Sequence, residues 1–407
     1  MVINMCEYNN VPKIRFKGFT DVWEQRKFKD YGSILMCKRI FKNETSDSGD
    51  VPFYKIGTFG EQADAFISIE KYEHYKSKFS YPNKGDILLS ASGTIGRIVE
   101  YTGEKAYFQD SNIVWLNHND NIKNKFLRFL YPTVKWDGIE GSTIKRLYNS
   151  NFLNTDIKVP NVTEQDKIGD LFTNLDNLIT LHQRKCDTLV NVKKSLLEKM
   201  FPKNSSNIPE IRFKEFTDVW EQRKLEGIVD FYRGHGLSWN DINEDGVNKC
   251  ILYGNLYTDY GMVINEVFRT TNCNKMDYFL SEVGDVLIPS SDTTPTGLAR
   301  ASSLNLKGII LGGDINVLRP KTVNGTFLSY LINNNKNELI KRIKGTTVRH
   351  LNNSDIKDMD LYISNNLNEQ VKIANLLTNL DNLITLHQRK LEKLKNIKKS
   401  MLEKMFV

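Results

Sequence analysis

The sequence predicts an α+β protein in which two strand-rich domains are separated by a pair of long antiparallel helices, with an internal pseudo-twofold repeat. Two observations predict this fold class. The segment TNLDNLITLHQRK occurs twice without a difference, at 173–185 and at 378–390. The segment IRFKGFTDVWEQRK at 14–27 recurs at 211–224 with one change. Because the sequence between these matching ends differs between the halves, we expect one fold used twice with different surfaces.

The first predicted domain covers residues 11–160 and has a formal charge of +5. Short apolar runs that break into polar loops predict strands: DILLSAS at 86–92, NIVWL at 112–116 and DIKVP at 156–160. The segment NKFLRFLYPTV at 124–134 predicts a short helix after the second of these strands.

Residues 161–203 predict a long amphipathic helix. Its apolar residues follow mostly three- and four-residue spacing, at Ile168, Leu171, Leu175, Leu178, Leu181, Leu189, Val192, Leu196 and Met200. Pro202 follows as a stop signal. At about 1.5 Å per residue, such a helix of some 35 residues spans roughly 50 Å.

The second predicted domain covers residues 208–363, has a formal charge of −2 and repeats the skeleton of the first. Three segments pair with segments of the first domain. VGDVLIPSSDTTPTGLAR faces KGDILLSASGTIGR, DINVLRP from Asp314 faces DSNIVWL from Asp110, and GTTVRHLNNS from Gly345 faces GSTIKRLYNS from Gly141. DLYIS at 360–364 predicts a strand, and GTFLSYLINNNK at 325–336 predicts a helix.

Residues 364–407 predict a second long helix that pairs with the central one. Its apolar positions are Ile373, Leu376, Leu380, Leu383, Leu386, Leu391, Leu394, Ile397, Met401 and Met405. A single helix would leave this stripe exposed, so we expect an antiparallel coiled coil. The predicted helix and partner interface comprises Leu171, Leu175, Leu178, Leu189, Val192, Leu196, Leu376, Leu380, Leu383, Leu394, Ile397 and Met401.

The polar segment HQRK interrupts each stripe, at 182–185 and 387–390. It serves either as a docking or phosphate-contacting spot, or as a solvated face with a polar residue that sets the register.

The sequence lacks the motifs of a self-sufficient enzyme. It has no GxxxxGK[ST] phosphate loop, no GxGxxG and no adjacent prolines, and its five cysteines are not spaced for a metal site. We therefore expect a binding protein with no catalytic residue, metal or cofactor of its own. The amino terminus lacks the layout of a signal peptide and no segment is apolar enough for a membrane helix, so we expect a cytoplasmic protein.

The order of a variable domain and a constant helix, repeated once, resembles the specificity (S) subunit of type I restriction-modification systems. The resemblance covers nearly the whole chain and depends on FTDVWEQRK at 19–27 and 216–224, on KGDILLSASGTIGR, and on the helix ends LLEKMF and MLEKMF. It implies two target-recognition domains that each read one half of a bipartite site in double-stranded DNA. It also implies two methyltransferase subunits docked on this chain, with restriction subunits in the full complex. S-adenosylmethionine, ATP and Mg would then bind the partner subunits.

The candidate DNA-binding residues lie in loops that follow predicted strands. In the first domain they are Ser90, Ser92, Gly93, Thr94, Arg97, Lys145 and Arg146. In the second they are Arg233, His235, Ser290, Ser291, Thr293, Thr294, Arg300, Arg349 and His350. Small hydroxyls, flexible backbone and cations suit close approach to a groove or a phosphate. The alternatives are a tight turn at Gly93 and Gly96 and a solvated basic edge at the cationic pairs, while Trp23 and Trp220 are expected to be core anchors.

Two other classes of function remain open from the sequence. A self-sufficient DNA enzyme would show activity without partners, and a coiled-coil scaffold would bind proteins without discriminating DNA sequences.

Overall fold

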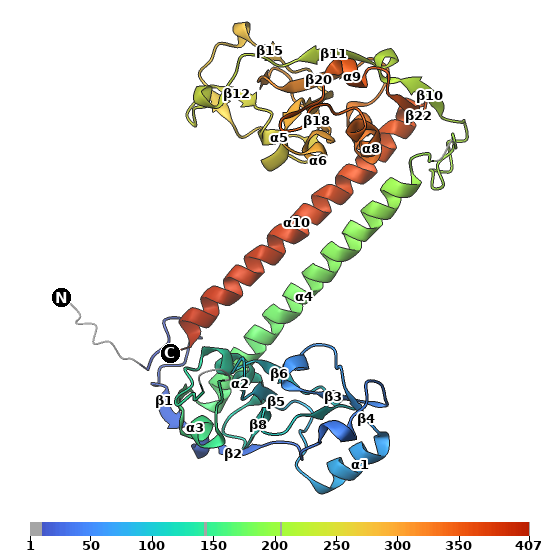
Figure 1. Cartoon of the computed structure of the whole chain (residues 1–407). Coiled ribbons are helices and arrows are strands. Elements are labelled where there is room, and N and C mark those ends of the chain that lie inside the picture. Colours follow the sequence, from blue (N-terminus) through green and yellow to red (C-terminus); the bar gives the residue numbers. More distant parts are fainter. Residues whose placement is uncertain (1–9, 142–144, 204–205, 407) are drawn as a thin grey trace, which may run out of the picture. The chain divides into compact units, whose positions relative to one another are not determined.

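The computed structural model describes residues 10–141, 145–203 and 206–406. It divides into two compact units, one made of residues 1–183 and 389–407 and the other of residues 184–388. Each unit joins one strand-rich domain to segments of both long helices, α4 (Val162–Lys199) and α10 (Leu367–Met405) (Figure 1). No helix among the described residues is both long and apolar enough to cross a membrane.

The first unit contains three small sheets. Their orders are β2-β8-β5-β6, β4-β3-β7 and β1-β9. The strands are β1 (Glu24–Lys27), β2 (Gly32–Leu35), β3 (Val51–Tyr54), β4 (Phe66–Ile67), β5 (Ile87–Ser90), β6 (Ile98–Glu100), β7 (Tyr107–Phe108), β8 (Ile113–His118) and β9 (Asp156–Val159). The helices of this domain are α1 (Ile69–Lys78), α2 (Asn124–Leu130) and α3 (Asn149–Asn154).

The second unit repeats this arrangement. Its sheets have the orders β11-β20-β16-β18-β13, β14-β12-β19-β15, β17-β21 and β10-β22. The strands are β10 (Glu221–Lys224), β11 (Val229–Arg233), β12 (Asn248–Ile251), β13 (Val263–Ile264), β14 (Thr270–Thr271), β15 (Phe279–Leu280), β16 (Asp285–Pro289), β17 (Ser291–Asp292), β18 (Ser302–Leu304), β19 (Ile310–Leu311), β20 (Ile315–Pro320), β21 (Arg349–His350) and β22 (Asp360–Ile363). The helices are α5 (Asn255–Thr258), α6 (Pro295–Leu298), α7 (Gly325–Asn334), α8 (Lys336–Ile340) and α9 (Asn353–Ile356).

The two domains share one skeleton, as the repeat predicts. The order β2-β8-β5-β6 in the first matches β11-β20-β16-β18 in the second, and the parallel pair β3 with β7 matches the parallel pair β12 with β19. The second domain has a further parallel pair, β13 with β18. The predicted α+β class with an internal repeat is therefore confirmed.

One detail of the predicted alignment is wrong. Leu88 of β5 pairs with Trp115 of β8, and its counterpart Leu287 of β16 pairs with Val317 of β20. Trp115 thus corresponds to Val317, and Asn112, not Asp110, corresponds to Asp314. A shift of two residues leaves the same face of a strand toward the core, so the apolar pattern alone cannot detect it.

The constant segments fasten each domain to the long helices. Trp23 is buried with its ring edge on Phe406, and Trp220 is buried with its ring edge on Phe201. The backbone N–H of Ile14 donates to the carbonyl of Lys404 at 3.0 Å. The expectation that both tryptophans anchor the core is confirmed.

A buried ion pair makes the same junction in both units. Arg15 donates to both carboxylate oxygens of Glu164, at 2.6 and 2.7 Å, and Arg212 donates to Glu369 at 2.6 and 2.9 Å. Both glutamates are fully buried near the start of a long helix. Such bidentate pairs hold a fixed geometry because the planar guanidinium matches the carboxylate.

Candidate nucleic-acid interface

In the first domain, the candidate loop after β5 lies beside the cationic segment near α3. The backbone N–H of Gly93 donates to the carbonyl of Lys145 at 2.9 Å, and Ser92 forms a β-bridge with Arg146. The side chains of Lys145 and Arg146 are exposed. Two segments predicted separately as DNA contacts therefore meet on one surface. Ser142, Thr143 and Ile144 of the quoted segment GSTIKRLYNS lie outside the described residues.

The hydroxyls of this loop shape the turn. Ser90 is buried, and its Oγ donates to the carbonyl of Thr94 at 2.6 Å and accepts from the backbone N–H of Arg97 at 2.9 Å. Gly93 and Gly96 both have positive φ, which a residue with a Cβ rarely adopts. The turn exposes Gly93 and Thr94 at the surface.

Arg97 is held at the edge of this loop. Its Nη1 donates to the carbonyl of Phe59 at 2.9 Å and lies 3.5 Å from a carboxylate oxygen of Glu61. The guanidinium is partly exposed, so it can still approach a phosphate.

The second domain brings the corresponding segments together in the same way. Strand β17 pairs with β21, which places Ser291 opposite His350 and Asp292 opposite Arg349. The Oγ of Ser291 and Nδ1 of His350 are 3.1 Å apart. The loop continues through the exposed residues Thr293 and Thr294 into α6.

Three arginines of the second domain, Arg233, Arg300 and Arg349, differ in the exposure of their side chains. Arg233 is exposed and donates to Asp314 at 2.8 Å and to Ser290 at 3.2 Å. Arg300 instead donates to the carbonyl of Tyr260 at 3.4 Å, and burial lowers the pKa of its guanidinium.

Arg349 donates to the carbonyl of Gly345 at 3.3 Å. His235 is exposed, with its ring stacked at 6.4 Å from that of Tyr278. Of these four side chains, Arg233 is the one that donates to both Ser290 and Asp314.

A turn that the sequence did not single out completes the surface in each domain. The Oγ of Ser92 donates to Asn112 at 2.7 Å, and Ser290 lies 3.3 Å from the equivalent Asp314. Ser111 and Asp314 are the non-glycine residues with positive φ among the described residues, at 54° and 59°. Strained backbone of this kind is concentrated at functional sites. The polar residues before β8 and β20 predict a turn, but their sequence does not indicate that the turn binds a ligand.

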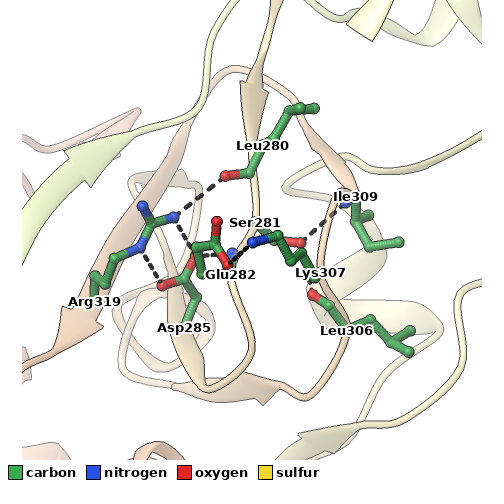
Figure 2. Close-up of polar contacts among 8 residues, drawn as sticks. All are labelled: Leu280, Ser281, Glu282, Asp285, Leu306, Lys307, Ile309 and Arg319. Atoms are coloured by element: carbon green, nitrogen blue, oxygen red, sulfur yellow. Dashed lines mark hydrogen bonds and ion pairs between the residues drawn. The ribbon is translucent and has the colours of Figure 1, made fainter.

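A polar network joins β16 and β20 at the end away from Ser290 and Asp314 (Figure 2). Arg319 donates to both carboxylate oxygens of the buried Asp285, at 2.9 and 2.8 Å, and to the carbonyl of Leu280 at 3.3 Å. The hydrogen bonds to Asp285 raise the pKa of Arg319. The hydroxyl of Ser281 holds the loop before β19, because it donates to the carbonyl of Leu306 and accepts from the backbone N–H of Ile309. These contacts fix β16 and β20, from which Ser290 and Asp314 extend.

The long helices are antiparallel within each unit. In the first unit Lys398 of α10 donates to Asp176 of α4 at 2.5 Å, and in the second unit Lys193 of α4 donates to Asp381 of α10 at 2.5 Å. The two pairs occupy equivalent repeat positions. In the first unit the ring of Phe172 also contacts that of Phe406, so residue numbers rise along α4 as they fall along the C-terminal segment. The predicted antiparallel pairing is confirmed.

The predicted apolar stripe is only partly buried within the two units. Leu175 and Leu380 are buried at equivalent positions, and Leu171, Leu196, Leu376, Leu394 and Met401 pack against the buried clusters. A second set remains exposed in three equivalent pairs, Leu178 with Leu383, Leu181 with Leu386, and Val192 with Ile397. Leu189 is half-buried. The spacing of the sequence places both sets on one broad stripe, so only the packing shows which of its members are covered.

The chain matches the family model described as the type I restriction modification DNA specificity domain, at residues 20–191 and again at 217–396. A putative type I restriction enzyme specificity subunit of Haemophilus influenzae is 54% identical over 155 residues, which cover 37% of this chain and 40% of that relative. The putative MjaX specificity subunit of Methanocaldococcus jannaschii is 22% identical over 99% of this chain and 97% of its own.

The fold is also that of a solved structure. The crystal structure of a type I restriction-modification system S subunit from M. genitalium superposes with a TM-score of 0.62 at 15% identity, covering 98% of this chain and 99% of that one. The family model spans well over half of the chain, and each match contains one candidate loop surface. The chain therefore belongs to the type I restriction-modification DNA specificity family.

Proposed function

We propose that this chain is the non-catalytic specificity subunit of a type I restriction-modification complex, and that its two domains read the two halves of a bipartite DNA site. The observation that carries this proposal is a shared skeleton with divergent loops. The ends of β5 and β16 present loops of different length and sequence on matching strands. Two surfaces built on one scaffold suit two different base sequences on one duplex.

The partners follow from the segments that do not diverge. Identical or near-identical residues recur in the long helices and in the strands β1 and β10. A pseudo-twofold surface suits two copies of one partner, and we assign these copies to methyltransferase subunits. The exposed pair Leu178 and Leu383 gives that partner an equivalent apolar contact on each side.

Catalysis is assigned to the partners. In this proposal S-adenosylmethionine binds the methyltransferase subunits, and ATP and Mg serve the restriction subunits. The described part of the chain has no group of three or more His, Cys, Asp or Glu side chains placed to hold a metal ion.

A domain replacement tests the proposal. Residues 28–160 are exchanged for the matching segment of another family member, and the DNA methylated by the assembled complex is sequenced. We expect one half of the methylated motif to change and the other half to stay. The matched control exchanges residues 225–363 and should change the opposite half. A change in both halves, or in neither, would contradict independent reading.

A further inference from the structure

Each domain has a strongly exposed aromatic ring at a 3-10 helix that follows β2 or β11. Phe41 precedes the 3-10 helix η2 (Lys42–Glu44) and is 61% exposed, and Trp239 begins the 3-10 helix η6 (Trp239–Asp241) and is 52% exposed. Each helix is closed by an acidic side chain that accepts from the backbone before it, Glu44 from Phe41 and Asp241 from Ser238. The two capped turns match, with Phe41 at the position of Ser238, so the rings occupy neighbouring positions of one scaffold.

Both rings follow a segment that runs along the strained turn. In the first domain Arg39 donates to Asp110 at 2.8 Å, two residues before Phe41. In the second domain Arg233 donates to Asp314 at 2.8 Å, and the backbone N–H of Gly234 donates to Ile315. The segment that leads to each ring is thus fastened to the turn that also holds Ser92 or Ser290.

Cations accompany the rings. The Arg269 guanidinium lies 6.0 Å from the Trp239 ring, and it also bonds Asp259 at 3.3 Å. Phe41 is flanked in sequence by Arg39 and Lys42, and Arg39 is more than half exposed. Aromatic rings bordered by cations suit duplex DNA, because a ring can contact the methyl group of thymine at a groove edge while the cations meet phosphates.

A protein partner fits these rings less well. A partner that binds both halves alike should meet the same residues twice, as it would at Leu178 and Leu383. Phe41 and Trp239 instead differ from each other and lie in the divergent parts of the repeat.

We propose that Phe41 and Trp239 are DNA contacts, each of which packs its ring against bases or sugars in the half-site that its own domain reads. The inference rests on the proposed function and extends it to a residue pair that the candidate loops do not include. Loss of one base contact in a duplex site weakens binding by roughly tenfold.

The test uses the full chain assembled with its methyltransferase and labelled duplexes carrying the methylated motif found by sequencing. Fluorescence anisotropy measures the affinity of Phe41→Ala and Trp239→Ala for the intact site and for sites with one half scrambled. We expect Phe41→Ala to lose about tenfold on the intact site and to lose nothing further once the half read by residues 11–160 is scrambled. Trp239→Ala should show the opposite dependence.

Matched controls separate this effect from general damage. Ile69→Ala and Met276→Ala remove exposed apolar side chains from the same two domains, and both should bind as the wild type does. Phe41→Tyr and Trp239→Phe keep a ring and should retain most of the affinity.

Three outcomes would overturn the inference. They are wild-type affinity of both alanine variants, an equal loss on every duplex, and a loss of methyltransferase assembly with unchanged DNA affinity of the remaining complex. If the wild type itself binds intact and fully scrambled duplexes equally, the proposed function fails instead.

Discussion

At the scale of single residues, the ion pairs Arg15–Glu164 and Arg212–Glu369 show what the constant segments do. Each joins the opening of a repeat to the start of a long helix, and each glutamate is fully buried. A buried carboxylate without its partner is costly, because its charge has lost water and gained nothing in return. These residues recur because both domains need the same junction.

Replacing Arg15 with Ala should destabilise the first unit by about 3 kcal/mol, since it leaves Glu164 charged and buried. Urea unfolding followed by circular dichroism measures the change. The matched control is Arg26→Ala, which breaks the exposed pair with Glu24 and should leave the stability close to that of the wild type. Equal stability of both variants would show that the buried pair contributes nothing.

At the scale of elements, the long helices separate two apolar sets. Leu175 and Leu380 are buried, whereas Leu178 and Leu383 are each 43% exposed. Exposed apolar side chains add little to the stability of a fold and, when grouped, mark interaction surfaces. Substitution of the exposed leucines therefore tests partner docking without removing a buried side chain from the fold.

The double variant Leu178→Asp with Leu383→Asp should fold normally and fail to assemble with methyltransferase subunits, because charges would have to be buried at both contacts. Light scattering of the mixed proteins gives the stoichiometry. Leu175→Ala with Leu380→Ala is the contrasting variant, and each change should cost about 2 kcal/mol or more of folding free energy. Normal assembly of the aspartate variant would rule out this face as the docking surface.

At the scale of the whole molecule, helix length is the property that we expect to set the gap between the half-sites. Four residues inserted after Val192 add about one turn, or roughly 6 Å, and nearly keep the helix face. A matching insertion in α10 belongs beside Asp381, because the helices are antiparallel and Lys193 pairs with Asp381.

With both insertions, the unspecified spacer should lengthen by one or two base pairs, since B-DNA rises about 3.4 Å per pair. The bases read in each half should stay the same. Sequencing of methylated DNA from wild type and variant gives both results. An active variant with an unchanged spacer would leave the helices as a docking surface alone.

The sequence by itself determined the architecture of this protein. The exact recurrence at 173–185 and 378–390, the apolar runs at β5 and β16, and the helical spacing of the long segments are local patterns, and they predicted the repeat, the strands and the antiparallel pair. These patterns suffice because the period of a strand or a helix depends only on residues that are close together in the sequence.

Only the tertiary structure decided how these elements meet. It set the two-residue shift between β8 and β20, the burial of Leu175 against the exposure of Leu178, and the meeting of Ser92 with Asn112 and Arg146. Each depends on contacts between residues far apart in the chain, where periodicity allows more than one register or face. The exposed rings of Phe41 and Trp239 emerged for the same reason, since exposure belongs to the packed fold and has no local signal.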